Sequence, residues 1–186
     1  MHAGQCDPFA TGFLGWTLTV DMLIMDVHRL LAQPAGTVME FDIEEGPRRL
    51  AGDLDVAFLR GKVQFLRTDY GLFAHGEIAT KLRIQCVRCL APISCALVIR
   101  LADQFAHNPR ALDQDQDAVF PISGKGTVDL ALPLRDHILL DLPLHPLCRP
   151  DCRGLCSQCG ANLNETQCDC SAAQIDPRLA VLKRLL

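Results

Sequence analysis

Apolar and polar side chains alternate along much of this chain, which is the pattern of strands that bury one face. Within residues 37–44, the apolar Val38, Phe41 and Ile43 are interspersed with acidic residues. Side chains on a strand point alternately to its two faces, so this segment is predicted to be a half-buried strand.

The same alternation continues in three longer segments that are predicted to be strands, namely residues 54–66, 72–85 and 93–105. Gly61 is predicted to form a bulge or a turn within the first of them. Between the second and the third lie only Cys86-Val-Arg-Cys89 and a short passage to Pro92. So short a connection predicts a hairpin whose loop carries two cysteines.

Helical segments are predicted to be few and short. Residues 25–31 fit either a helical turn or a strand, whereas residues 134–142 place four apolar side chains on one helical face. Near the C-terminus, Asp176 is placed to cap a helix that runs to residue 186. Residues 107–126 are polar and are predicted to form a loop.

These elements divide the chain into three parts. Residues 1–24 follow no regular period and are interpreted as an N-terminal extension without fixed structure, the alternative being a helix or strand that packs on the domain. Residues 25–147 are expected to form a β-rich core domain that includes the cysteine hairpin. Residues 148–186 are expected to form a cysteine-rich, zinc-binding tail that ends in a helix.

The composition is that of a globular protein, and we expect the protein to be cytoplasmic. Its 186 residues suffice for a hydrophobic core, and the formal net charge is −4. The apolar run at residues 13–25 is interrupted by Asp21 and is too short to span a bilayer, and it lacks the flanks of a signal peptide. The ten cysteines are therefore expected to be reduced thiols available to metal, not disulfides of a secreted scaffold.

Six of the ten cysteines lie between Cys148 and Cys170, which is too many for one tetrahedral zinc ion and too few for two. The remaining pair with metal-binding spacing is Cys86 and Cys89, in the predicted hairpin loop. Six and two make two complete zinc sites. The predicted ligand sets are Cys156, Cys159, Cys168 and Cys170 for one site, and Cys86, Cys89, Cys148 and Cys152 for the other.

The first ligand set is local, whereas the second joins distant parts of the chain. Gly160 directly follows Cys159, as in metal knuckles where a glycine lets the chain turn. Loss of the local site is expected to loosen only the tail. Loss of the second site, which closes a loop of about 60 residues, is expected to detach the tail from the hairpin. His145 is an alternative ligand there, Cys95 is expected in the core, and Cys6 is assigned no role.

Neither predicted site resembles catalytic zinc, which keeps three protein ligands and an open position. The sequence contains no His-Glu-x-x-His, no phosphate-binding glycine loop and no dinucleotide fingerprint. Iron–sulfur ligation fits the residue types, but the spacings match neither ferredoxin pattern. We therefore expect no catalytic residues and no small-molecule substrate.

Basic residues gather around the second ligand set. Lys81 and Arg83 share one face of a predicted strand, and Arg88, Arg149 and Arg153 lie among its cysteines. Because guanidinium groups suit phosphate recognition, these five residues are predicted to bind RNA. The alternative is that they offset thiolate charge or form surface ion pairs. An acidic chain is not expected to coat nucleic acid, so any RNA contact would be local.

With these motifs in view, the chain resembles the YceD-like family. The resemblance extends over residues 25–186 and rests on Cys86-Val-Arg-Cys89-Leu-Ala-Pro92, Ile138-Leu-Leu-Asp-Leu-Pro-Leu144, Cys148-x3-Cys152-Arg-Gly-Leu-Cys156-x2-Cys159-Gly-Ala-Asn-Leu-Asn164 and Asp176-Pro-Arg-Leu-Ala-Val-Leu182. It implies a bacterial or organellar protein linked to accumulation of large-subunit ribosomal RNA and often encoded beside a large-subunit ribosomal protein.

Together these observations predict an α+β fold, with an antiparallel sheet that can close into a barrel-like form, short helices and a zinc-bound C-terminal segment. The expected function is that of a non-enzymatic zinc-binding factor that supports large-subunit ribosomal RNA accumulation and ribosome assembly through RNA contact. The alternative is a zinc-dependent adaptor that binds a ribosomal protein or assembly factor without touching RNA. A third interpretation is a thiol redox or metal-sensing protein.

Overall fold

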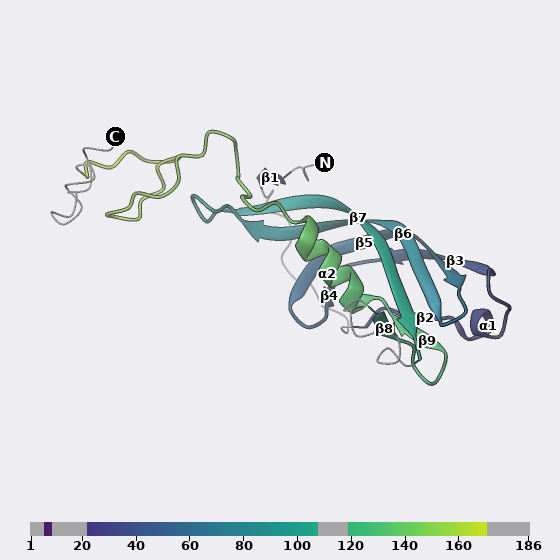
Figure 1. Cartoon of the computed structure of the whole chain (residues 1–186). Coiled ribbons are helices and arrows are strands. Elements are labelled where there is room, and N and C mark those ends of the chain that lie inside the picture. Colours follow the sequence, from purple (N-terminus) through teal and green to yellow (C-terminus); the bar gives the residue numbers. More distant parts are fainter. Residues whose placement is uncertain (1–5, 9–21, 108–118, 171–186) are drawn as a thin grey trace, which may run out of the picture.

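The computed structural model describes residues 6–8, 22–107 and 119–170, and its centre is a seven-stranded sheet (Figure 1). Its four main strands follow one another along the chain, each antiparallel to the next: β3 (Val38–Glu45), β5 (Leu54–Arg67), β6 (Leu72–Gln85) and β7 (Pro92–Ala106). Three short strands complete the sheet: β4 (Arg48–Leu50) on β5, and β1 (Cys6–Pro8) and β8 (Val119–Pro121) on β7.

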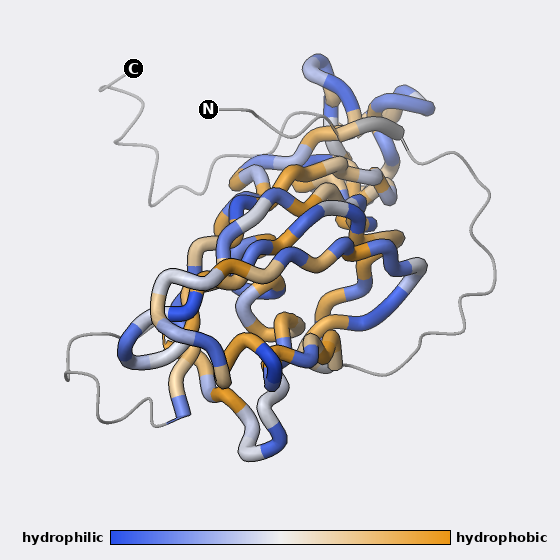
Figure 2. The backbone as a smooth tube through the Cα atoms, turned by 90° about the vertical axis from the view of Figure 1, so that its right-hand side faces the viewer, coloured by the Kyte–Doolittle hydropathy of each residue, from blue (hydrophilic) through white to orange (hydrophobic). Residues whose placement is uncertain are grey.

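The strands predicted from alternation are confirmed, with shifts of at most one residue at their ends. Strands β6 and β7 pair from Leu72 opposite Phe105 to Gln85 opposite Pro92. The hairpin with Cys86 and Cys89 in its loop is therefore confirmed. Hydrophilic and hydrophobic residues alternate visibly along the strands (Figure 2), as a sheet with one buried face requires.

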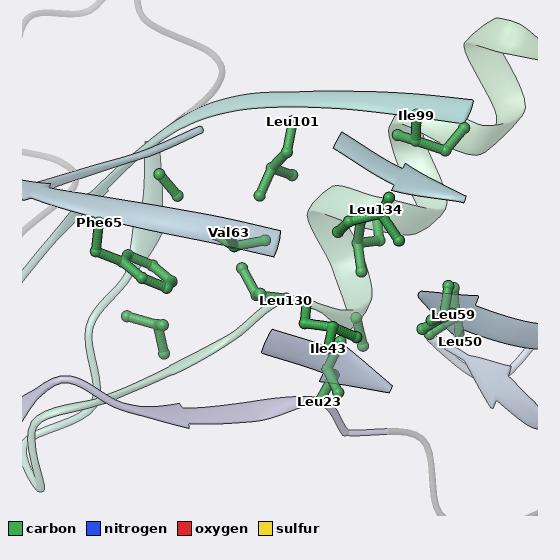
Figure 3. Packing of buried hydrophobic residues seen from close by; sticks show 14 of the residues in the cluster. Leu23, Ile43, Leu50, Leu59, Val63, Phe65, Ile99, Leu101, Leu130 and Leu134 are labelled. Atoms are coloured by element: carbon green, nitrogen blue, oxygen red, sulfur yellow. The ribbon is translucent and has the colours of Figure 1, made fainter. Parts of the chain in front are cut away.

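The sheet curls into a half barrel, and its inner face builds one hydrophobic core. Phe65 of β5, Ile78 of β6 and Ile99 of β7 are completely buried in it. Helix α2 (Ala131–Asp141) packs on β7 and β4 and contributes Leu134. Figure 3 shows aliphatic side chains from the strands and the helix converging on this space. The predicted class, an antiparallel barrel-like sheet with short helices, is confirmed.

Two glycines on the inner face of adjacent strands permit the curl. A Cβ atom on Gly61 would collide with the Glu77 backbone oxygen and stand 2.8 Å from the Cα of Ile78. A Cβ on Gly76 would likewise collide with the Lys62 oxygen of the neighbouring strand. Gly61 lies in unbroken register, opposite both Ile43 and Ile78. The prediction of a bulge or turn at Gly61 is therefore wrong, because this glycine serves a close approach of strands.

The irregularity in β5 lies elsewhere, between Val56 and Leu59. The pairing with β6 passes from Val56 opposite Leu82 to Leu59 opposite Thr80, so β5 has one residue more than β6 between these two pairs. Such a bulge bends its strand and strengthens the local twist.

A second, two-stranded sheet of β2 (Ile24–Asp26) and β9 (Thr127–Asp129) supplies further core residues. Helix α1 (His28–Leu31) follows β2 directly, so residues 25–31 contain both of the structures that their pattern allowed. Helix α2 begins at Ala131, earlier than predicted, and the Asp129 carboxylate just before the helix accepts a hydrogen bond from the Ala131 backbone N–H at 2.9 Å.

Some predictions fall outside the described residues, among them the C-terminal helix from Asp176 and most of residues 1–24. Strand β8 occupies the described part of the predicted 107–126 loop, together with the turn that leads into β9. Within the described part of the chain, no helix is long and apolar enough to cross a bilayer.

Strand β1, at Cys6–Pro8 within the predicted N-terminal extension, pairs with the edge of the core domain. Cys6 lies directly opposite Cys95 of β7, and the two form a disulfide. Cys95 is buried, as predicted, but the expectation that every cysteine is reduced is wrong for this pair. The sequence alone could not pair them, because residues 89 apart meet only through the register of β1 on β7.

The close approach at Gly61 leads to a stability prediction. Replacing Gly61 by Ala should lower the free energy of unfolding by about 1–3 kcal/mol, since the added methyl group overpacks the β5–β6 contact. The matched control is Gly46→Ala, where nothing lies within 4 Å of the new atom. Urea unfolding of both variants would measure the difference. Equal stability of the Gly61 and Gly46 variants would contradict this account of the curl.

Candidate metal centres

Four cysteines from two distant segments meet at the end of the β6–β7 hairpin. We call Cys86, Cys89, Cys148 and Cys152 the inner cluster, since all but Cys148 are buried. The sulfur atoms of Cys86 and Cys152 stand 3.8 Å apart, and those of Cys89 and Cys148 stand 3.6 Å apart. The pairing predicted across the chain is thus found in the structure.

These separations fit a tetrahedral metal ion. Four sulfur atoms at 2.3 Å from a central zinc ion would lie about 3.8 Å from one another. In the inner cluster all four sulfur atoms lie within 4.8 Å of each other. His145 is exposed and is not among the four ligands that come together there, so its predicted alternative role is not needed.

The remaining four tail cysteines form a second group, which we call the outer cluster: Cys156, Cys159, Cys168 and Cys170. Their sulfur atoms also lie within 4.8 Å of one another. Cys159 and Cys170 are exposed and the other two are half-buried. Both predicted ligand sets are therefore brought together, one in the interior and one near the surface.

The two Cys-x2-Cys segments have the same backbone conformation. In the outer cluster, the Gly160 N–H donates to the Cys156 oxygen at 3.0 Å, and Gly160 is left-handed with φ of 73°. In the inner cluster, the Leu90 N–H donates to the Cys86 oxygen at 3.0 Å, and Leu90 has φ of 59°. The inner knuckle thus holds a leucine in a conformation that normally favours glycine, which the sequence did not reveal.

Several hydrogen bonds attach the tail to the hairpin loop beside the inner cluster. The Leu155 N–H donates to the Arg88 oxygen at 3.1 Å, and the Val87 N–H donates to the Pro146 oxygen at 3.0 Å. The Arg88 guanidinium donates to the Cys152 oxygen at 2.8 Å. Gly154 has φ of 78°, and a Cβ there would stand 3.1 Å from the Arg88 oxygen. The tail backbone therefore passes closer to the hairpin than most other residues would permit.

The thiols of the inner cluster differ in their acidity. Burial raises the pKa of Cys86, but the backbone N–H groups of Cys89, Cys148 and Arg88 outweigh it and lower this pKa to about 6. Burial, together with the neighbouring thiols, raises the pKa of Cys148 to about 12. At neutral pH and without metal, the inner cluster therefore contains both deprotonated thiolates, such as Cys86, and protonated thiols, such as Cys148.

The outer cluster shows the same division. The backbone N–H groups of Cys159 and Gln158 lower the pKa of Cys156 to about 6. The hydrogen bond with Cys159 raises the pKa of Cys170 to about 12. Since a metal binds thiolates, each cluster must lose protons when a divalent ion enters.

Asn164 is a functional candidate that sequence reasoning missed. It belongs to the loop between Cys159 and Cys168 of the outer cluster, yet its side-chain N–H donates to the Cys152 sulfur at 3.3 Å. Its side-chain oxygen accepts hydrogen bonds from the Arg149 guanidinium and the Arg153 backbone N–H, both at 2.8 Å. The only signal for this role was the Asn-Leu-Asn ending of the cysteine motif.

Three of the five predicted RNA-binding residues meet at the inner cluster. Arg88 lies in the knuckle, and Arg149 and Arg153 are exposed on the tail beside it. Lys81 and Arg83 lie on the outer face of β6, alternating with buried residues, as predicted. Arg83 stands three residues before the knuckle, or about 10 Å along the strand. We call these five residues the basic surface.

One catalytic pattern occurs in the chain, since His75-Gly-Glu77 matches the His-x-Glu of zinc deaminases. It lies on the outer face of β6, where Glu77 forms an ion pair with Arg100 at 3.3 Å. Glu77 lies nine positions before Cys86, about 30 Å along the strand. This pair is therefore remote from the inner cluster.

Comparisons with known proteins agree with these motifs. The model of the family described as large ribosomal RNA subunit accumulation protein YceD matches residues 74–186. An uncharacterised protein of Mycobacterium tuberculosis is 32% identical over 193 residues, covering 100% of this chain and 89% of its own length.

Two chloroplast proteins, each named large ribosomal RNA subunit accumulation protein YCED homolog 1, are also similar. The one from Zea mays is 40% identical over 72 residues, covering 35% of this chain and 24% of its own length. The one from Arabidopsis thaliana is 25% identical over 187 residues, covering 86% of this chain and 56% of its own length. No solved structure matches the chain. By its cysteine motifs, its family match and its similarity over the whole length, the chain belongs to the YceD family of large ribosomal RNA subunit accumulation proteins.

Proposed function

We propose that this protein is a non-enzymatic, cytoplasmic zinc protein that supports accumulation of large-subunit ribosomal RNA by contacting RNA through its basic surface. The observation that carries the proposal is the meeting of Arg88, Arg149 and Arg153 around the inner cluster. Zinc is the proposed metal because two four-thiolate sets with tetrahedral spacing suit a closed structural site. A closed thiolate shell leaves no position for substrate, which supports a role in binding.

Metal would assemble the basic surface as well as fold the tail. Arg149 and Arg153 reach the hairpin only through the tail segment that begins at Cys148. No acidic residue lies between Glu77 and Asp103, so the hairpin side of this surface carries cations alone. Arginine guanidinium groups commonly hydrogen-bond to RNA phosphates and stack on the unpaired bases of loops. Single-stranded or loop RNA is therefore the proposed ligand.

A specific observation also favours the second candidate, an adaptor that binds a ribosomal protein or assembly factor. Leu140 at the end of α2 is 81% exposed, and Leu144 in the passage to the tail is 91% exposed. Val87 of the hairpin loop, whose N–H bonds to Pro146, is also exposed. Exposed apolar side chains of this kind suit a protein partner better than RNA.

The pKa values of the thiols give a prediction for zinc loading. Adding zinc to metal-free, reduced protein at pH 7 should bind two equivalents and release protons, because Cys148 and Cys170 still carry theirs at that pH. Lowering the pH to 5 also protonates Cys86 and Cys156, so each cluster's affinity should fall by at least about a hundredfold. Competition with a chromophoric chelator would measure it. One equivalent, or affinity independent of pH, would refute this description of the clusters.

The RNA contact predicts a measurable dependence on salt. For three to five phosphate contacts with single-stranded RNA, the log–log slope of affinity against salt should be about −2 to −4. Replacing both Arg83 and Arg153 by Glu should abolish binding to large-subunit RNA fragments. Arg88 is unsuitable for this test, because its guanidinium donates to the Cys152 oxygen and its loss would disturb the inner cluster.

The matched control reverses the same amount of charge at the opposite end of the sheet. Arg29 of α1 and Lys125 before β9 are exposed and lie far from the cysteine tail (Figure 1). The double variant Arg29→Glu with Lys125→Glu should bind RNA nearly as well as the unaltered protein. If the two double variants weaken binding equally, only overall charge matters. If the unaltered protein shows no salt-dependent binding, the adaptor becomes the better account.

A further inference from the structure

The loop of the outer cluster reaches into the inner one through a single side chain. Asn164 lies between Cys159 and Cys168, which are ligands of the outer cluster, while its side-chain N–H contacts the sulfur of Cys152 in the inner cluster. The same amide's oxygen holds the guanidinium of Arg149. One side chain therefore touches a ligand of the inner cluster and a residue of the basic surface.

The position of Asn164 depends on the fold of its own loop. Its backbone N–H and side-chain N–H both donate to the Asn162 side-chain oxygen, at 3.1 and 2.9 Å. Asn162 is in turn fixed by an isolated bridge to Leu155 and by N–H groups of Glu165 and Thr166 that donate to its backbone oxygen. These are short-range contacts in a segment that is half-buried at best. A metal ion held by Cys159 and Cys168 would close this loop at both ends.

We propose that Asn164 couples the two clusters, so that filling the outer cluster with zinc raises the affinity of the inner cluster and fixes Arg149. A hydrogen bond to a metal-bound thiolate orients the ligand and reduces its excess charge, and such outer contacts typically change metal affinity about 10- to 100-fold. Coupling of binding is reciprocal, so inner zinc also favours outer zinc. The inference rests on the proposed function in one respect, that both clusters bind zinc.

Because its thiols are exposed, the outer cluster responds first when the metal supply or the redox state of the solution changes. Cys159 and Cys170 are exposed, whereas Cys86 and Cys89 are buried. Chelators and oxidants therefore reach the outer cluster first. Loss of zinc from the outer cluster would then lower the zinc affinity of the inner cluster and release Arg149 of the basic surface. Under this proposal the outer cluster is a regulatory zinc site, whereas its local ligand spacing alone predicts a site whose loss loosens only the tail.

The test is a cycle of four full-length proteins: unaltered, Asn164→Ala, Cys168→Ser with Cys170→Ser, and all three substitutions together. Zinc affinity of the inner cluster is measured by chelator competition at pH 7.4. Cobalt absorption in the thiolate charge-transfer region counts the bound thiolates, and the outer-site variant, in which only the inner cluster is complete, gives the reference signal for the inner site. Asn164→Ala alone and the outer-site double variant alone should each weaken inner binding about 10- to 100-fold. The three substitutions together should weaken it no more than the outer-site variant, because Asn164 acts only when its loop is closed.

Two further variants separate coupling from general loosening of the loop. Asn164→Asp keeps the oxygen that accepts from Arg149 but loses the N–H that donates to Cys152, so it should weaken inner binding as Asn164→Ala does. Gln167→Ala, at an exposed position of the same loop, should leave inner affinity unchanged. Two bound equivalents with inner affinity unaffected by Asn164→Ala, or with fully multiplicative effects, would overturn the coupling and leave the proposed zinc sites standing. A protein that binds no zinc would overturn both.

Discussion

The arrangement of this protein depends on four sulfur atoms that fasten its tail to the end of a hairpin. Residues 142–170, which include the described part of the tail, contain no helix or strand, and their backbone is held by turns and one isolated bridge. Few of their side chains are buried, so hydrophobic burial contributes little there. A tetrahedral ion would replace the missing core, and its binding energy would be folding energy for this segment. The basic surface exists only if that connection forms.

The half barrel makes the connection possible without depending on it. Its core is closed by the inner faces of β5, β6 and β7, by α2 and by the β2–β9 pair, none of which draws a side chain from the inner cluster. Among the described residues, only Ile84, near the end of β6, packs against both the core and the cysteines. Gly61 and Gly76 let neighbouring strands approach and bend the sheet. Because β6 and β7 stay in register as far as Gln85 and Pro92, the hairpin loop is held at a defined place where the tail can meet it.

Much of this was accessible from sequence, because alternation and cysteine number act through simple rules. Period-two segments gave the four main strands, and a count of eight suitably spaced thiols gave both clusters. Other features depend on register or backbone conformation, which composition does not encode. The Cys6–Cys95 disulfide needs the pairing of β1 on β7, and the left-handed Leu90 occupies a position that the outer knuckle gives to Gly160. In the sequence Asn164 is an ordinary loop residue, and its role becomes visible only in the folded tail, where its side chain contacts Cys152.

Hydrogen exchange on the reduced, zinc-loaded protein and on the Cys86→Ser variant tests the central connection most directly. The informative amides are those of Val87 and Leu155, which cross between the hairpin loop and the tail, and the amide of Ile78 in the sheet serves as the internal reference. The account predicts that Cys86→Ser loses protection at Val87 and Leu155 by at least about a hundredfold while Ile78 keeps it. Unchanged protection at Val87 and Leu155 in the variant would contradict the claim that the inner cluster fastens the tail.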